Sequence, residues 1–264
     1  MHTYKGTSFA EAYQKSLIDL MDNGDLCETR GTTSRELLNV SLEITDPSQC
    51  MYTNMARSTQ TKYIAAEFLW YYAGRNDVAF ISKYAKFWEQ IQNPNGTANS
   101  AYGNLIFKPK SLGGITQYEW AIASLAKDKD SRQAILHFNT PEHQYSGNKD
   151  FVCTMYGIFH IRHNKLHFSV YMRSNDAIWG TPTDVAFFCS LQMQALAHLK
   201  EFYPELELGT YTHHANSYHI YDRHYELVSK MLLGEFIPTR LPSVKTNLVS
   251  MSGHPTQDFT DIFE

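Results

Sequence analysis

Residues 166–184 read Leu-His-Phe-Ser-Val-Tyr-Met-Arg-Ser-Asn-Asp-Ala-Ile-Trp-Gly-Thr-Pro-Thr-Asp, and this stretch decides the predicted fold. Its first seven residues favour a strand over 166–172, and a polar turn follows directly after it. The apolar run 185–202 then predicts a long helix that ends near Pro204. The polar side chains between strand and helix are therefore held at the end of a strand.

Other segments extend the same pattern in both directions. Ser8 and Glu11 form a capping-box pattern before a helix that Asn23-Gly24 ends. The stretch Arg162-His163-Asn164-Lys165 predicts a tight hairpin turn between two strands. Further strands are expected at 37–44, 133–138 and 154–162, and further helices at 60–73 and 223–233. Without repeats or linkers, the sequence predicts a single α+β domain over 1–264, with a mixed sheet and long flanking helices.

Composition excludes several classes of protein. Of 264 residues, 43% are apolar and 19% are charged, which is typical of a globular protein. The net charge of −4 provides no basic field for DNA or anionic membranes. No apolar run approaches the ~18 residues of a membrane helix, and the first five residues lack the apolar core of a secretory signal. The predicted location is the cytoplasm, either of a cell or of a phage-infected host.

The four cysteines are widely spaced, which argues against a zinc ribbon or a disulfide framework. Cys153 follows the polar loop 146–150 at the entry to a strand, where a thiolate could face a cleft as a nucleophile. The alternative interpretation is a small buried side chain, which we adopt for Cys189. Cys27 and Cys50 carry no further prediction.

Glu67 lies in the middle of the apolar segment 60–73. A buried carboxylate costs several kcal/mol unless it is paired or takes up a proton, so Glu67 is either a general acid or base or half of an ion pair with an arginine. Arg173 and Ser174 are suited to phosphate, although a plain polar turn remains the alternative.

Four histidines cluster in the sequence at positions 213, 214, 219 and 224. They come without a cysteine or carboxylate at ligand spacing, and their stretch is predicted to be a strand followed by a helix, on which they would not converge easily. Hydrogen-bonding or core roles are therefore favoured over a metal site.

Seven ordered motifs resemble the thymidylate synthase family over about 60–230. They are Glu67-Phe-Leu-Trp70 with Ala73-Gly74-Arg-Asn, Trp88, Tyr102-Gly103, Asp130-Ser131-Arg132, Cys153, Arg173-Ser174-Asn175-Asp176 with Gly180 and Pro182, and His219-Ile220-Tyr221. The resemblance implies a sheet-to-sheet homodimer and 5,10-methylenetetrahydrofolate as co-substrate, without a metal. Gln133 replaces the second arginine of the family's Asp-Ser-Arg-Arg segment.

The resemblance also implies a role for each matching residue. Cys153 is the nucleophile, and Glu67 organises proton transfers. Asp184 reads the base, and the other nucleotide-binding residues are Arg30, Arg132 from the partner chain, Arg173, Ser174, Asn175, His219 and Tyr221. Arg35 is the rival of Arg30 at the phosphate. The folate-binding residues are Trp88, Asp176 and Gly180.

Departures from the synthase pattern point to a branch. Synthases have Pro-Cys-His at the nucleophile, whereas this chain has Asp150-Phe-Val-Cys-Thr154, and they have Asn at the position of Asp184. These changes, with Asn99-Ser100 and Met172, resemble the phage-type deoxycytidylate hydroxymethylases. A carboxylate can accept from the cytosine amino group and from protonated N3, whereas it would face an acceptor on uracil, a mispairing of about 1–3 kcal/mol.

The predicted reaction is therefore hydroxymethylation of dCMP, in which water rather than hydride captures the methylene intermediate. Alternatives are a CMP hydroxymethylase, because His219 and Tyr221 do not read the 2′ position, and a methylase of dUMP or dCMP. A non-catalytic nucleotide- or RNA-binding relative is disfavoured by the intact Cys153 and Glu67. The expected partners are a pyrimidine nucleoside monophosphate, folate and a second copy of the chain, without membrane or DNA.

Overall fold

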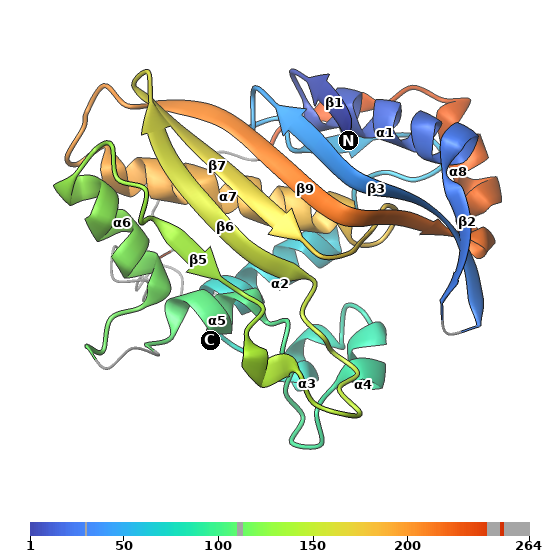
Figure 1. Cartoon of the computed structure of the whole chain (residues 1–264), viewed down its shortest axis with the longest axis horizontal. Coiled ribbons are helices and arrows are strands. Elements are labelled where there is room, and N and C mark those ends of the chain that lie inside the picture. Colours follow the sequence, from blue (N-terminus) through green and yellow to red (C-terminus); the bar gives the residue numbers. More distant parts are fainter. Residues whose placement is uncertain (30, 110–112, 242–248, 251–264) are drawn as a thin grey trace. The chain divides into compact units, whose positions relative to one another are not determined.

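The computed structural model describes residues 1–29, 31–109, 113–241 and 249–250 (Figure 1). These residues form two compact units. Each unit is assembled from separate stretches of the chain. Among the described residues, unit 1 draws on the ranges 1–60, 167–193 and 208–241, and unit 2 draws on the ranges 61–166, 194–207 and 249–250. The single domain over 1–264 stays a prediction. Arg30 lies outside the described residues.

A mixed sheet forms the centre of unit 1. Its strands are β1 (His2–Gly6), β2 (Asp25–Thr29), β3 (Thr32–Ile44), β7 (Lys165–Met172), β8 (Asn175–Asp176) and β9 (Glu207–Tyr221). They run in the order β1-β3-β9-β7, with β2 beside β3 and β8 beside β9. The pairs β1–β3 and β8–β9 are parallel, whereas β2 and β9 are antiparallel to β3. The predicted α+β fold with a mixed sheet is confirmed.

The N-terminal helix α1 (Phe9–Asn23) lies against β1 and β3 of this sheet (Figure 1). As predicted, the Ser8 hydroxyl caps it by accepting from the Glu11 N–H at 3.3 Å, and the backbone ends the helix at Gly24. Phe9 and Tyr13 from its buried face stack with ring centroids 4.8 Å apart. The remaining elements of unit 1 are β4 (Met51–Thr53), its antiparallel partner β10 (Ile237–Thr239), η2 (Asp222–His224) and α8 (Tyr225–Leu232).

The long helix α7 (Thr181–Leu199) covers one face of the sheet in unit 1 and continues into unit 2. Phe188 packs against Phe168 of β7 with ring centroids 6.2 Å apart. Gln192 donates to the Gly209 carbonyl of β9 at 3.3 Å. The helix begins at Thr181 rather than at the predicted 185, because Pro182 needs no N–H partner in a first turn. The predicted binding residues 173–176 thus lie between the end of β7 and the start of this helix.

Unit 2 is mainly helical. Its elements are α2 (Thr61–Tyr72), α3 (Val78–Ile81), α4 (Phe87–Ile91), α5 (Tyr102–Phe107), α6 (Gln117–Lys127), β5 (Ile135–His137), η1 (Pro141–His143) and β6 (Thr154–Arg162). Strand β6 has the predicted bounds and pairs antiparallel with β5, which is shorter than the predicted 133–138. His163 and Asn164 both have positive φ, 50° and 57°, as a type I′ turn requires.

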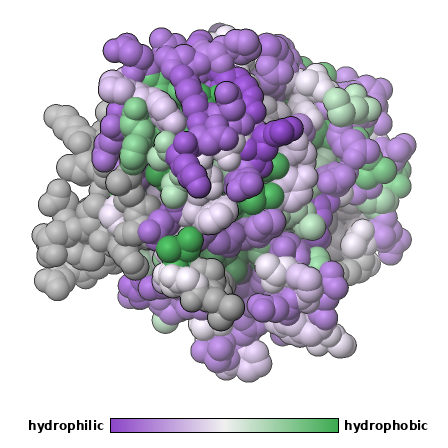
Figure 2. Space-filling model, turned by 60° about the vertical axis from the view of Figure 1, so that its left-hand side comes forward, coloured by the Kyte–Doolittle hydropathy of each residue, from purple (hydrophilic) through white to green (hydrophobic). Residues whose placement is uncertain are grey.

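The face of the molecule in Figure 2 is mainly hydrophilic, with apolar residues in small separate groups. Among the described residues, no helix has the length and apolar character that crossing a membrane requires.

Close contact between α2 and α5 depends on Gly103. A Cβ atom at this position would lie 1.7 Å from the Tyr71 carbonyl oxygen and 2.4 Å from its Cα. The neighbouring Tyr102 ring stacks on the Tyr71 ring, with centroids 5.3 Å apart. The Tyr-Gly pair thus pins α5 on the helix that carries Glu67.

We therefore expect Gly103→Ala to destabilise the protein by more than about 2 kcal/mol, since the added carbon meets backbone that cannot move aside. Gly234→Ala is the matched control, because its nearest neighbour would be the Asn54 amide nitrogen at 3.4 Å, an ordinary contact. Urea unfolding followed by circular dichroism measures both variants. Equal midpoints for the two would contradict the close packing of α2 and α5.

Candidate active site

The segment after β7 carries the largest group of predicted site residues, all in unit 1. The short strand β8 places Asn175 beside Tyr218 and Asp176 beside His219. The Asp176 Oδ1 atom accepts from the backbone N–H groups of Ile178 and Trp179 at 2.7 and 2.9 Å. These bonds turn the chain from the sheet into α7 and hold the Asp176 carboxylate in one orientation.

Asp184 lies in the first turn of α7 and is half-buried. Its Oδ2 atom accepts a hydrogen bond of 2.8 Å from the side-chain amide of Asn175, which is only 3% exposed. A Cβ atom at Gly180 would lie 2.9 Å from that amide nitrogen and 3.4 Å from Asp184 Oδ2. Gly180, predicted to bind folate, thus also leaves room for the hydrogen bond between Asn175 and Asp184.

His219 and Tyr221 are half-buried and alternate along β9, so they share one face of that strand. Their ring centroids are 5.1 Å apart at an angle of 78°. His219 Nδ1 is buried without a hydrogen-bond partner among the described residues. A buried polar atom without a partner is costly, and it fits the predicted role of binding a substrate hydroxyl.

The predicted phosphate residues of unit 1 lie at the end of β7. Arg173 and Ser174 are half-buried, and the Arg173 carbonyl accepts from the Ser217 N–H at 3.2 Å. Arg35, the rival of Arg30, lies in β3 with its guanidinium 5.7 Å from the Tyr225 ring centroid. Phosphate binding by these arginines stays a prediction.

Sequence analysis missed an aromatic group beside Asp176. The Trp179 side chain is 54% exposed, and the Arg57 guanidinium lies 4.0 Å from its ring centroid. Its indole N–H donates to His224 Nε2 at 2.9 Å, and burial lowers the pKa of His224, which favours the accepting neutral ring. In the sequence, Trp179 is only an apolar residue before Gly180, because its neighbours in space, Arg57 and His224, are distant along the chain.

In unit 2, Glu67 is buried in α2, with 5% of its surface exposed. The Tyr63 hydroxyl, one turn earlier, donates to Glu67 Oε1 at 2.7 Å, and the Trp88 indole N–H donates to the same hydroxyl at 3.0 Å. Trp88 is itself buried and packs edge-on against Trp70, with ring centroids 5.1 Å apart. The structure therefore links two predicted site residues, Glu67 and Trp88, through a tyrosine that sequence analysis missed despite its four-residue spacing from Glu67.

Cys153 is half-buried at the entry to β6, and its Sγ atom lies 3.9 Å from the Phe151 carbonyl oxygen. The preceding loop is fixed by Asp150, whose two carboxylate oxygens accept from the backbone N–H and the hydroxyl of Ser100 at 2.9 and 2.5 Å. Asn99 donates to the Asp150 carbonyl at 3.1 Å. Two separate departures from the synthase pattern are thus in direct contact.

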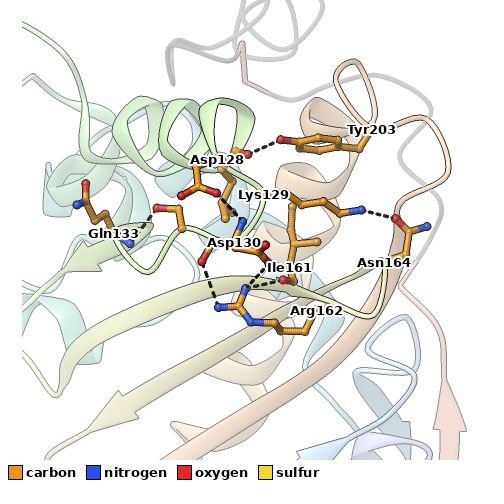
Figure 3. A network of polar contacts seen from close by, with 10 residues as sticks. Asp128, Lys129, Asp130, Gln133, Ile161, Arg162, Asn164 and Tyr203 are labelled. Carbon is orange, nitrogen blue, oxygen red and sulfur yellow. Dashed lines mark hydrogen bonds and ion pairs between the residues drawn. The ribbon is translucent and has the colours of Figure 1, made fainter.

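Arg132 is exposed in a loop whose neighbours form the polar network of Figure 3. Arg162 donates to the Asp130 carbonyl at 3.2 Å and lies 3.6 Å from its carboxylate. The Ser131 hydroxyl accepts from the backbone N–H of Gln133 at 3.2 Å. The loop is braced within the chain, so the Arg132 side chain is presented to solvent, as donation to a second chain would require.

Within each unit, the structure brings several predicted residues together. In unit 1 they are Asn175, Asp176, Gly180, Asp184, His219 and Tyr221. In unit 2, Glu67 is linked to Trp88, while Cys153 and Arg132 lie in separate loops. Across the described ranges, His, Cys, Asp and Glu residues form no group of three or more that could hold a metal ion.

Comparison with known proteins gives relatives for almost the whole chain. A model of the family described as thymidylate synthase matches residues 11–262. A deoxyuridylate hydroxymethyltransferase of Bacillus phage SP01 is 28% identical over 236 residues, which are 84% of this chain and 59% of that protein. This chain therefore spans less than two thirds of the SP01 protein.

A deoxycytidylate 5-hydroxymethyltransferase of Enterobacteria phage T6 is 32% identical over 174 residues, which are 63% of this chain and 70% of that protein. Thermostable thymidylate synthase A from Bacillus subtilis has a similar fold, with a TM-score of 0.74, 24% identity and coverage of 91% of both chains. Motifs, fold and family match agree, and the chain belongs to the thymidylate synthase family.

Proposed function

We propose that this chain is a deoxycytidylate 5-hydroxymethyltransferase, which converts dCMP, 5,10-methylenetetrahydrofolate and water to 5-hydroxymethyl-dCMP and tetrahydrofolate. The observation that carries the proposal is Asp184, a carboxylate that accepts a hydrogen bond from Asn175. A carboxylate only accepts hydrogen bonds, and cytosine can donate two of them, from its amino group and from protonated N3. The T6 relative, whose name states this reaction, supports the proposal.

Asp184 both selects the base and activates it in this proposal. Its carboxylate accepts from the cytosine amino group and from N3 once that nitrogen carries a proton. A protonated N3 withdraws electrons from the ring, so carbon 6 is attacked more readily. Against uracil, the same carboxylate faces the carbonyl oxygen at carbon 4, and two acceptors oppose each other.

Cys153 supplies the nucleophile. Its thiolate adds to carbon 6, and carbon 5 then attacks the one-carbon unit. Carbon 5 loses its proton, the bond from the one-carbon unit to the folate nitrogen breaks, and tetrahydrofolate leaves, so that an exocyclic methylene remains on the ring. Water adds to this methylene, and the thiolate leaves carbon 6 to restore the ring. Glu67 receives the proton from the water, and the Tyr63 hydroxyl held by Trp88 keeps its carboxylate in place.

The remaining polar residues hold the nucleotide. Arg173 and Ser174 bind the phosphate, together with Arg30 and with Arg132 of a partner subunit in a homodimer. His219, whose buried Nδ1 atom has no partner among the described residues, and Tyr221 bind the 3′-hydroxyl. The exposed position of Arg132 supports its donation across a dimer interface.

Bound 5,10-methylenetetrahydrofolate would supply a one-carbon unit at the oxidation level of formaldehyde. Asp176, fixed by two backbone N–H groups, would hydrogen-bond the pterin. Trp179 is exposed and lies under the Arg57 guanidinium. The indole offers a flat apolar surface, and the guanidinium offers a positive charge, to a ligand such as folate that has both aromatic rings and carboxylates. Trp88 would flank the pterin, and its indole is fixed by the hydrogen bond that it donates to Tyr63.

Hydroxymethylation of dUMP is the second candidate, because the SP01 relative carries that name and matches 84% of this chain. A cytosine ribonucleotide, CMP, is a further candidate substrate. The product test below separates all three.

Incubation of the purified protein with methylenetetrahydrofolate and, separately, dCMP, CMP or dUMP tests the proposal. We expect a hydroxymethylated product from dCMP, measured by mass spectrometry, with no dihydrofolate absorbance. A methylated product with dihydrofolate would contradict water capture. Turnover of dUMP in preference to dCMP would contradict the assignment of the base.

Asp184→Asn should move the preference from dCMP toward dUMP, since an amide can pair with both the N–H and the carbonyl of uracil. A mispairing of about 1–3 kcal/mol corresponds to roughly a 5- to 150-fold change in the ratio of kcat/KM for the two substrates. Asp25→Asn, on the exposed strand β2, is the matched control and should leave the ratio unchanged. An unchanged ratio in Asp184→Asn would exclude base reading by Asp184.

Cys153→Ser should abolish turnover and covalent trapping. Fluorine at carbon 5 cannot leave as a cation, so 5-fluoro-dCMP with methylenetetrahydrofolate should leave the wild-type protein covalently loaded. Intact-protein mass spectrometry should detect this adduct in the wild type and in Cys27→Ser, but not in Cys153→Ser. An adduct in Cys153→Ser would assign the nucleophile to another residue.

A further inference from the structure

A chain of buried hydrogen bonds leads from the middle of β9 to Asp184. The Tyr211 hydroxyl lies 2.8 Å from His213 Nδ1, and His213 Nε2 lies 3.0 Å from Asn175 Oδ1. Asn175 then donates to Asp184 at 2.8 Å. Tyr211 is fully buried, and His213 and Asn175 are 1% and 3% exposed, so the chain is closed to solvent from Tyr211 as far as Asn175.

The direction of each bond in this chain follows from chemistry. An ionised carboxylate only accepts, so the Asn175 NH₂ group must face Asp184, and its oxygen must face the other way. That oxygen accepts from the Thr181 hydroxyl at 2.5 Å. His213 Nε2 can then only donate to it, because two acceptors would otherwise oppose each other.

The protonation state of His213 agrees with this direction. Burial, with a smaller contribution from nearby His214, lowers the pKa of His213 to about 3. The ring is therefore neutral at physiological pH and carries its one proton on Nε2. Its Nδ1 atom then accepts from Tyr211, so every donor in the chain points toward Asp184.

We infer that Asn175 and His213 are positioning residues for base selection: they hold the Asp184 carboxylate in place and keep it an acceptor. The inference rests on the proposed function, since it assigns a purpose to the orientation of Asp184. It also changes the predicted role of Asn175 from binding the nucleotide to orienting Asp184, because its amide is engaged by His213, Thr181 and Asp184.

The sharpest test replaces the donor without changing its shape. In Asn175→Asp, a second carboxylate would stand 2.8 Å from Asp184, and two such groups share a proton rather than both ionise. Asp184 could then donate, which suits uracil. We expect the ratio of the dissociation constants for dUMP and dCMP, measured by calorimetry, to fall at least tenfold.

His213 offers a matched set of variants. His213→Leu removes the donor to Asn175 and should lower the same ratio about 2- to 10-fold, as expected for one hydrogen bond. His213→Gln should restore it, because the amide nitrogen of glutamine lies as many bonds from the backbone as Nε2. His214→Leu, adjacent on β9, removes a hydrogen bond to Ser41 and the stacking of the imidazole on the Tyr171 ring but no hydrogen bond of the chain to Asp184, and is the control.

Variant ratios test the inference, whereas the wild-type ratio tests the proposed function. A wild type that binds dUMP more tightly than dCMP would contradict the proposed function alone. Ratios that stay at the wild-type value in Asn175→Asp and His213→Leu, while thermal midpoints fall, would mean that the chain serves stability only, and the inference would be wrong. A changed ratio that His213→Gln rescues would support it.

Discussion

The hydrogen bond from Asn175 to Asp184 determines the direction of every polar contact around it. Because a buried amide must satisfy both of its ends, a carboxylate at position 184 orients Asn175, and Asn175 orients the His213 ring. Gly180 completes the constraint, since any side chain there would meet the Asn175 amide nitrogen at 2.9 Å. The orientation of the Asp184 carboxylate is therefore a property of a buried network and not of one side chain.

The buried carboxylates of unit 2 are also held by hydrogen bonds from neighbouring side chains. Glu67 accepts a hydrogen bond from the Tyr63 hydroxyl, and Asp150 accepts hydrogen bonds from the hydroxyl and the backbone N–H of Ser100. Hydrogen bonds of this kind offset the cost of removing a carboxylate from water. They also fix its position, since each donor is itself packed, as Trp88 shows by holding Tyr63.

Patterns of neighbouring residues in the sequence correctly predicted those helices, strands and turns that depend on contacts between residues close together in the chain. The capped helix α1, the strand β6 and the turn at His163-Asn164 all follow from residues a few positions apart. The strand β9 was recognised only in part, because its histidines and other polar residues hide the alternation expected of a half-buried strand. The short helix α5 was missed, because it is held by contact with α2 rather than by its own pattern. The motif residues were found, but not the hydrogen bonds that orient them, because partners such as Asn175 and His213 lie 38 positions apart.

The contact between Asp150 and Ser100 is another that the sequence does not show, because the two residues are far apart along the chain. Each residue was recognised separately as a departure from the synthase pattern, and 50 positions separate them in the chain. Their contact makes the two departures one change, because a buried carboxylate without its donors would cost about 1–3 kcal/mol.

Asp150 also lies three residues before Cys153, so the loop that leads to the nucleophile depends on Ser100, which immediately precedes the Ala101-Tyr102-Gly103 segment. Gly103 packs against Tyr71 of the helix that carries Glu67. The loop of the proposed nucleophile and the helix of the proposed base are thus both held from one short segment, 100–103.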